Sequence, residues 1–201
     1  MLDRNDAPDS LLGDSRMPLA PDKSFTGVVR AGLERACRDF TARVEPLGFR
    51  RTLKMFWTRR HPLTVDFIHF HRSGSTYGAP RNATVDIRVH FGIRVLNDDF
   101  VAAALNGPHS DPGRLRAGRY HLRFNAETGS TYDRCVDDLA RFTVEQGEPW
   151  FQRWSSVDAL LQSDSPLRPQ DREFLSAARD GQASAERVAA SLKILGIKEI
   201  P

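Results

Sequence analysis

The order of apolar and polar positions along the chain separates a helical start, a strand-rich middle and a helical end. From Ser24 onward, apolar residues recur at steps of three and four, which is the period of an amphipathic helix. This pattern predicts a helix over Phe25–Leu47 that ends at Gly48, a residue type favoured just past a helix C-terminus. The apolar positions of this helix are Val29, Leu33, Ala36, Cys37, Phe40, Val44 and Leu47.

The next part of the chain has runs of β-branched and aromatic residues that are typical of strands. Four strands are expected, at Leu53–Arg60, Leu63–Arg72, Ala83–Val95 and Arg119–Phe124. The break at His61-Pro62 predicts a hairpin between the first two strands. Because short hairpins cannot join parallel neighbours, the sheet is expected to be antiparallel.

The third expected strand has the clearest alternation in the chain. Its apolar positions are Val85, Ile87, Val89, Phe91, Ile93 and Val95, and the positions between them are Thr84, Asp86, Arg88, His90, Gly92 and Arg94. Successive side chains of a strand point to opposite faces. We therefore expect one face of the sheet to pack against the helix Phe25–Leu47 and the other face to be polar.

The rest of the chain reads as helical after one short helix and a loop. A helix capped by Asn97 is expected over Asn97–Leu105, followed by a loop up to Gly118. A helix is then expected at Tyr132–Gln146, closed by Gly147. A short helical turn is expected around Trp150, Phe151 and Trp154, and another helix after a cap at Ser155 or Ser156. The last two helices are expected as a pair at Gln170–Arg179 and Ala183–Leu195. The aromatic cluster in this region is more typical of a core than of an interface.

This order of elements predicts the α+β class: an antiparallel four-stranded meander packed by an N-terminal helix and followed by a C-terminal helical region. Residues 1–23 are expected to be a flexible arm, residues 24–165 an α+β domain, and residues 166–201 a helical pair packed on or appended to it. No apolar run reaches the roughly 20 residues that span a bilayer. No secretory signal is visible either, and Cys37 and Cys135 suit buried free thiols. We expect a soluble cytoplasmic protein without a membrane partner.

The net charge of +3 is unevenly distributed. Residues 48–124 hold 13 Lys and Arg against 5 Asp and Glu, a net charge of +8, while both flanks are net acidic. The basic residues and histidines that share polar strand faces are Arg88, His90 and Arg94 on one strand, and Arg119, His121 and Arg123 on another. Such a surface attracts an anionic partner, whether an acidic protein, a nucleic acid or a phosphorylated metabolite. The alternative is a solvated face partly covered by the acidic C-terminal helices.

Three histidines raise the question of a metal site. His69 and His71 lie two residues apart and share a strand face, and His90 on a neighbouring strand could complete a zinc site. The sequence has no H-E-x-x-H motif and no close Cys pair, and the nearby Asp66 is expected on the opposite face. We therefore expect hydrogen-bonding or surface histidines, no metal and no cofactor.

A nucleophilic site has weaker support. Ser73 or Ser75 could lie beside His71, with Asp66 or Asp86 to orient the imidazole, but no G-x-S-x-G turn frames either serine. Cys135 is expected in mid-helix, away from the helix N-termini that lower a thiol pKa. No catalytic residue is assigned from the sequence.

The order of motifs resembles a family of bacterial proteins known as domain of unknown function 4304, over residues 24–160. The motifs that carry the resemblance are the leading helix, LGFRR at Leu47–Arg51, the aromatic pair Phe56-Trp57, HFHRS at His69–Ser73 and VHFGI at Val89–Ile93. His71 occupies a position that is Gln-like in the family, and His90 one that is Asn-like. An amide can replace a hydrogen-bonding imidazole but is a poor zinc ligand, so the resemblance implies a hydrogen-bonding role. It implies no catalytic residue.

The sequence therefore favours a non-enzymatic binding module that attracts an anionic partner to an Arg-rich sheet face, which the histidines 69 and 71 would extend. Two alternatives stay open. One is a hydrolase-like enzyme with a histidine-lined site, with or without metal. The other is an immunity-type protein that neutralises a toxin, where charge steering would speed capture of an acidic target.

Overall fold

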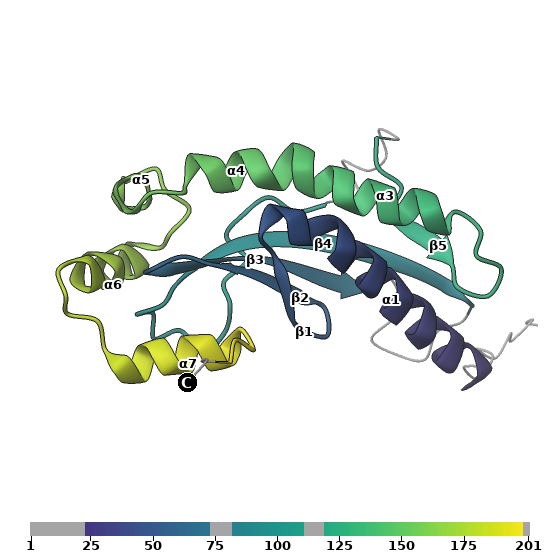
Figure 1. The fold of residues 1–201 in the computed structure, drawn as a ribbon, viewed down its shortest axis with the longest axis horizontal. Helices are drawn as coiled ribbons and strands as arrows, with labels where there is room; N and C mark the ends of the chain where they lie inside the picture. The colour runs from purple at the N-terminus through teal and green to yellow at the C-terminus, as the bar shows by residue number, and fades with distance from the viewer. Residues whose placement is uncertain (1–22, 73–81, 111–118, 199–201) are drawn as a thin grey trace, which may run out of the picture.

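The computed structural model of the 201-residue chain describes residues 23–72, 82–110 and 119–198 (Figure 1). The expected N-terminal arm and the serines at 73 and 75 lie outside these ranges, Lys23 excepted. The described residues form an antiparallel, curled sheet with helices on both of its faces, so the prediction of the α+β class is confirmed.

The N-terminal helix is confirmed as the sequence predicted it. Helix α1 (Lys23–Val44) buries its apolar stripe completely at Val29, Ala36 and Phe40. A 3₁₀ turn over Glu45–Leu47 follows, and the chain leaves it through Gly48 at φ 86°. This left-handed conformation is open to glycine at little cost, which explains the abrupt change from helix to strand.

The sheet has five strands rather than four. They are β1 (Arg50–Leu53), β2 (Phe56–Arg60), β3 (Thr64–Arg72), β4 (Thr84–Val95) and β5 (Arg123–Asn125), and each pairs antiparallel with the next in the order β1-β2-β3-β4-β5. The expected first strand is divided between β1 and β2 by a turn at residues 54–55, where Arg51 donates hydrogen bonds to the Lys54 carbonyl. The hairpin at His61-Pro62 is confirmed, because the His61 N–H donates to the Thr64 carbonyl.

The expected strand Arg119–Phe124 is mostly irregular, and β5 begins only at Arg123. The reason is that the His121 N–H donates to the Asp138 carboxylate of a helix at 2.7 Å and not to a neighbouring strand. The expected alternation nevertheless holds, since Tyr120, Leu122 and Phe124 are buried.

The expected helix Asn97–Leu105 is wrong, because the chain is a turn followed by irregular structure there. The carbonyls of Phe100 and Ala102, which a helix would use internally, accept hydrogen bonds from Arg94. Asn97 does not cap a helix here; its amide donates to the Phe174 carbonyl and its oxygen accepts the Ser184 N–H. Tertiary contacts therefore override the local cap signal.

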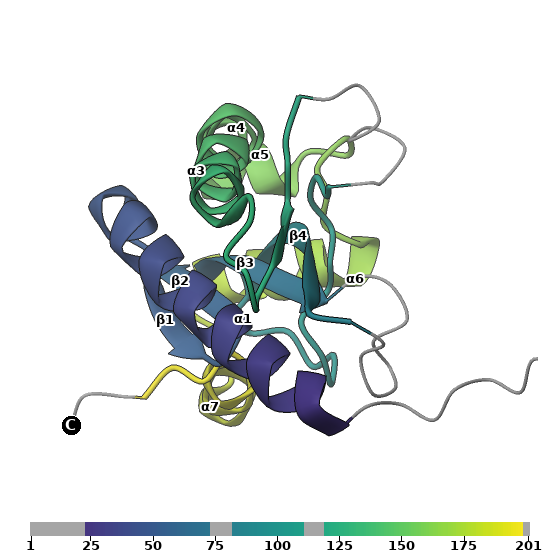
Figure 2. The same ribbon diagram turned by 90° about the vertical axis from the view of Figure 1, so that its right-hand side faces the viewer.

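One face of the sheet is covered by α1 and by a long helix that follows β5 (Figure 2). The long helix runs through α3 (Tyr132–Phe142), a π-helical turn over Thr143–Gly147 and α4 (Glu148–Arg153). The expected end at Gly147 is wrong. A Cβ at Gly147 would lie 2.8 Å from the Phe91 ring, so this glycine allows a close approach of helix to sheet and does not stop the helix.

The C-terminal helices are confirmed, and they pack on both faces. Helix α5 (Val157–Leu161) is capped by Ser156, whose hydroxyl accepts the Ala159 N–H. The predicted pair appears as α6 (Pro169–Arg179) and α7 (Ala185–Ile194). Helix α7 lies on the opposite side of the sheet from α3 and α4 (Figures 1 and 2). It helps to build a second core there, made of Phe56, Val65, Phe67, Leu96, Leu192 and Leu195.

The close packing at Gly147 gives a stability prediction. Gly147→Ala is expected to lower the free energy of unfolding by about 1–3 kcal/mol, because the methyl group would overpack against Phe91. Gly27→Ala in α1 is the matched control: a Cβ there meets nothing within 4 Å, so this change is expected to raise stability by about 0.5–1 kcal/mol. Urea-induced unfolding measures both, and a Gly147→Ala protein as stable as wild type would contradict the packing.

Candidate functional site

The sheet face opposite α1, which we call the second face, brings four histidines together. In the β3–β4 register His69 lies directly opposite His90, and an isolated bridge pairs His90 with His109. Directly opposed residues of antiparallel strands share a face, so these three imidazoles lie side by side on adjacent segments. His71, two residues after His69, shares the same face. We call His69, His71, His90 and His109 the histidine row.

The rings of the histidine row are in direct contact. Ring centroids are 4.0 Å apart for His69 and His71, 4.7 Å for His71 and His90, and 5.4 Å for His90 and His109. At the other end, the Phe56 ring lies 5.0 Å from His69 and marks the border with the core under α7. The row therefore runs from an apolar end at Phe56 to an exposed end at His109.

Burial and repulsion between neighbouring groups lower the pKa values of three members of the row, His69, His71 and His90. Burial lowers the pKa of His69 to about 4, and the neighbouring His71 and His90 add to this. Burial likewise lowers the pKa of His90 to about 4, with further effects from His71, His109 and Arg88. The pKa of His71 is lowered by burial and by Arg88. A neutral imidazole carries one N–H donor and one acceptor nitrogen, so the row can donate hydrogen bonds as well as accept them.

One nitrogen of the row and one of the neighbouring Arg88 have no hydrogen-bond partner among the described residues. Within the described part of the structure, His71 Nε2 and Arg88 Nε are buried and have no hydrogen-bond partner. His71 and Arg88 are direct cross-strand partners, so the two side chains lie on the same patch of the sheet. An unsatisfied buried polar group costs about 1–3 kcal/mol. A ligand that accepts hydrogen bonds from both groups would recover this cost.

The structure divides the other sequence-predicted site residues among different surroundings. Arg94 is only 2% exposed and donates to Ser191 of α7 as well as to carbonyls of the 97–102 segment. Burial lowers its pKa, and Asp98 lies 3.4 Å away. The expectation that Arg94 belongs to an accessible basic face is therefore wrong, because α7 covers this end of the face.

The residues expected on the last strand are also dispersed. Arg119 forms an ion pair with Glu145 at 2.7 Å and so is already neutralised. His121 is half-buried before β5. Arg123 is exposed and lies opposite Asp86 in the β4–β5 register, on the same face as Arg88. Of the predicted residues, His71 thus lies opposite Arg88, and His69 lies opposite His90. Arg123 is on the same sheet face, opposite Asp86.

His109 was not expected at the site. It follows Gly107-Pro108 in a segment with no apolar periodicity, so no local pattern placed it beside a strand. It is positioned by backbone hydrogen bonds from Phe91 N–H to the Pro108 carbonyl and from Ser110 N–H to the Val89 carbonyl. The tight Gly-Pro loop after β4 is the one sequence signal that pointed to a close return of the chain.

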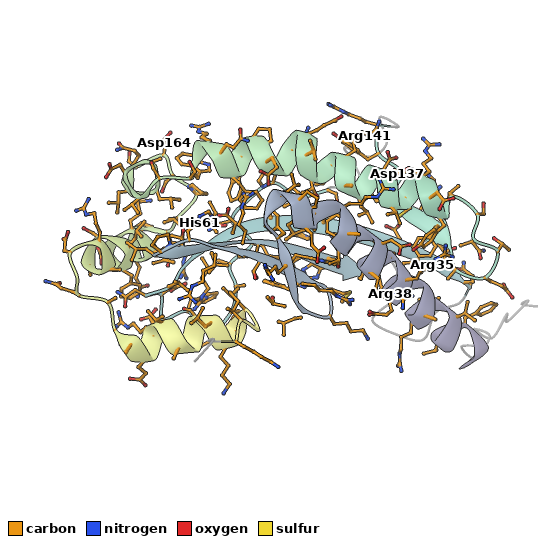
Figure 3. The ribbon with its side chains drawn as sticks, in the orientation of Figure 1. Arg35, Arg38, His61, Asp137, Arg141 and Asp164 are labelled. Carbon is orange, nitrogen blue, oxygen red and sulfur yellow. The ribbon has the colours of Figure 1, made fainter. Side chains whose placement is uncertain are left out.

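His61 and Asp66 belong to a separate network on the sheet face that α1 covers, which we call the first face. His61 Nε2 lies 2.9 Å from Asp66 Oδ2 at the β2–β3 turn, at the end of the sheet (Figure 3). Arg59 bonds the same carboxylate and also Glu148 of α4, which ties the sheet to that helix. The expectation that Asp66 points away from His69 and His71 is confirmed, so Asp66 cannot orient His71 in a catalytic triad.

The remaining chemical groups give little support for nucleophilic or metal chemistry. Cys37 and Cys135 are buried free thiols, as expected, and burial raises their pKa values to about 11 and about 12. Among residues 23–72, 82–110 and 119–198, no group of three or more His, Cys, Asp or Glu side chains is placed to hold a metal ion.

Mutation can test whether the buried Arg94 contributes more to stability than the exposed Arg119. Arg94→Met is expected to lower the free energy of unfolding by about 3–5 kcal/mol, because it removes the donor to the Phe100 and Ala102 carbonyls and a cation beside the buried Asp98 carboxylate. Arg119→Met removes an arginine from an exposed ion pair and is expected to change stability little. Thermal and urea unfolding compare the two. Similar effects of both changes would show that Arg94 is not the internal anchor described here.

Comparisons of this chain with family models, with curated proteins and with solved structures give no match. None of the helices in the described ranges combines the length and the apolar character needed to cross a membrane. A function for this protein must therefore be inferred from the arrangement of the histidine row and Arg88 on the second face.

Proposed function

We propose that this protein is a binding module that takes a single oxyanion group at Arg88 and the histidine row. The observation that carries the proposal is the pair of buried, unpartnered nitrogens on the cross-strand partners His71 and Arg88. Arg88 Nε donates, and so does His71 Nε2 in the tautomer that carries its proton on this nitrogen. Hydrogen bonds in which the donor or the acceptor is ionised are about twice as strong as neutral ones.

The surrounding charge supports an anion over a cation at this site. Arg88 and Arg123 share the face, and residues 48–124 carry a net charge of +8. The neighbours that depress the pKa values of the row are all cationic when charged. Each neutral imidazole beside the guanidinium already carries one N–H donor and can offer it to an anion without gaining a proton first.

A carboxylate of a protein or a small molecule fits this site better than duplex DNA. Nucleic-acid binding draws on several phosphate contacts, each worth a slope of about −0.9 in log affinity against log salt. Arg94 and Arg119 are committed to internal partners, which leaves Arg88 and Arg123 as the arginines of the predicted set that can face a ligand. Capture of an acidic toxin by an immunity-type protein would be one form of this binding, and the likeness to domain of unknown function 4304 agrees with a hydrogen-bonding role for the histidines.

The alternative of a histidine-lined enzyme has less support. Its best argument is the contact among four imidazoles, which the sequence could not establish. Among the described groups that could activate a nucleophile, Asp66 lies on the other face and both thiols have raised pKa values, while Asp86 lies opposite Arg123. Binding is the function that the described groups can perform together.

The proposal predicts a site-specific response to a simple oxyanion. Sulfate added at constant ionic strength is expected to shift the NMR signals of the His71 and His90 rings, because both lie beside the Arg88 guanidinium. Arg88→Gln should abolish the saturable shift, whereas Arg119→Gln, which removes an arginine already paired with Glu145, should retain it. An equal response of both variants, or no saturable shift in wild type, would contradict the proposed function.

A further inference from the structure

We propose that oxyanion binding at Arg88 is coupled to proton uptake by the histidine row, so that the site binds its ligand more tightly in mildly acidic solution. This inference rests on the proposed function and adds a regulation to the same site. It follows from the contacts within the row and from the charges that face it.

Proton uptake by the free row is opposed by the spacing of its rings. Because the ring centroids are 4.0 to 5.4 Å apart, a positive charge on one imidazole strongly disfavours protonation of the next imidazole. The rings are also half-buried, except for the exposed His109, so water screens this repulsion only in part. Burial first, and this repulsion in addition, lower the pKa values of His69 and His90 to about 4.

The groups that face the row come from all the described segments around it. They are His69 and His71 from β3, Asp86, Arg88 and His90 from β4, His109 from the segment after β4, Arg123 from β5 and the neutral Phe56 from β2. The one carboxylate in this set, Asp86, lies opposite Arg123. Arg94 shares the β4 face but is enclosed by α7 contacts.

A bound dianion reverses this balance. Negative charge beside Arg88 offsets the guanidinium and favours protonation of the adjacent His71 and His90, which raises their pKa values toward the ordinary value of 6.5. By linkage, a ligand that promotes protonation is itself bound more tightly by the protonated protein. One proton taken up per anion gives a change of about tenfold in affinity for each pH unit within the window from about pH 6.5 down to about pH 4.

The chain suggests its own control variant. Gln and Asn side chains place a hydrogen-bonding group at about the reach of an imidazole nitrogen but do not titrate. The double variant His71→Gln, His90→Asn therefore keeps donors at both positions and removes the coupled protons. His61→Gln is the matched control, because it removes one histidine from the opposite face, where it pairs with Asp66.

Sulfate is a suitable probe because it stays a dianion throughout this pH range and takes up no proton itself. Calorimetric titrations at pH 7.5, 6.5 and 5.5, in pairs of buffers with different ionisation enthalpies, give both the affinity and the number of protons taken up. For wild type and His61→Gln we expect affinity to rise up to about tenfold between pH 6.5 and 5.5, with up to one proton taken up per sulfate.

For the double variant we expect the affinity, whatever its value at pH 6.5, to change less than about twofold over the same range. Circular dichroism confirms folding at each pH. Sulfate binding by wild type with no proton uptake would overturn the coupling and leave the binding site standing. Full proton uptake by the double variant would show that other groups take up the proton and would overturn the role of the row. Absence of sulfate binding at every pH would overturn the proposed function together with this inference.

Discussion

The pairing register of β3 and β4 is the constraint on which the candidate site depends. A slip of one residue would move every side chain of a strand to the other face. The register is held from the first face by the complete burial of Ile68, Phe70, Val89 and Phe91. It is also held from the second face, where Gly92 lies opposite Phe67 and a Cβ at this position would collide with the Phe67 ring. With these contacts satisfied, His69 must face His90 and His71 must face Arg88.

Helix α7 covers one end of the second face of this sheet, and the histidine row lies beyond the core that α7 helps to build. Arg94 and Arg88 lie on the same face of one strand, six residues apart. Arg94 is enclosed by Ser191 and by the carbonyls of the 97–102 segment, so its charge stabilises the fold. Arg88 lies beyond the apolar core under α7, and its Nε has no hydrogen-bond partner among the described residues. The same residue type thus has a structural role at Arg94, whereas Arg88 is the arginine to which we assign the proposed oxyanion.

Much of the fold follows from local sequence patterns, whereas the site required tertiary information. Helix α1 and the apolar face of β4 could be predicted because their periodicities of 3.6 and 2 are strong. The helix expected at Asn97 failed because Arg94, brought there by the sheet, takes the carbonyls that the helix needs. Gly147, in the π-helical turn, packs closely against the Phe91 ring, and His109 is placed by a backbone bridge to His90. No local pattern encodes contacts of this kind.

The most direct test of the account is a crystal structure of the protein grown with selenate, a sulfate analogue whose selenium can be located by its anomalous scattering. If Arg88 and His71 form an oxyanion site, we expect a selenium peak on the second sheet face, with selenate oxygens within about 2.7–3.2 Å of Arg88 Nε and His71 Nε2. The peak should be lost in crystals of Arg88→Gln. A selenate bound only elsewhere, with Arg88 and His71 bonded to other protein groups, would contradict the central claim that these two residues form an oxyanion site.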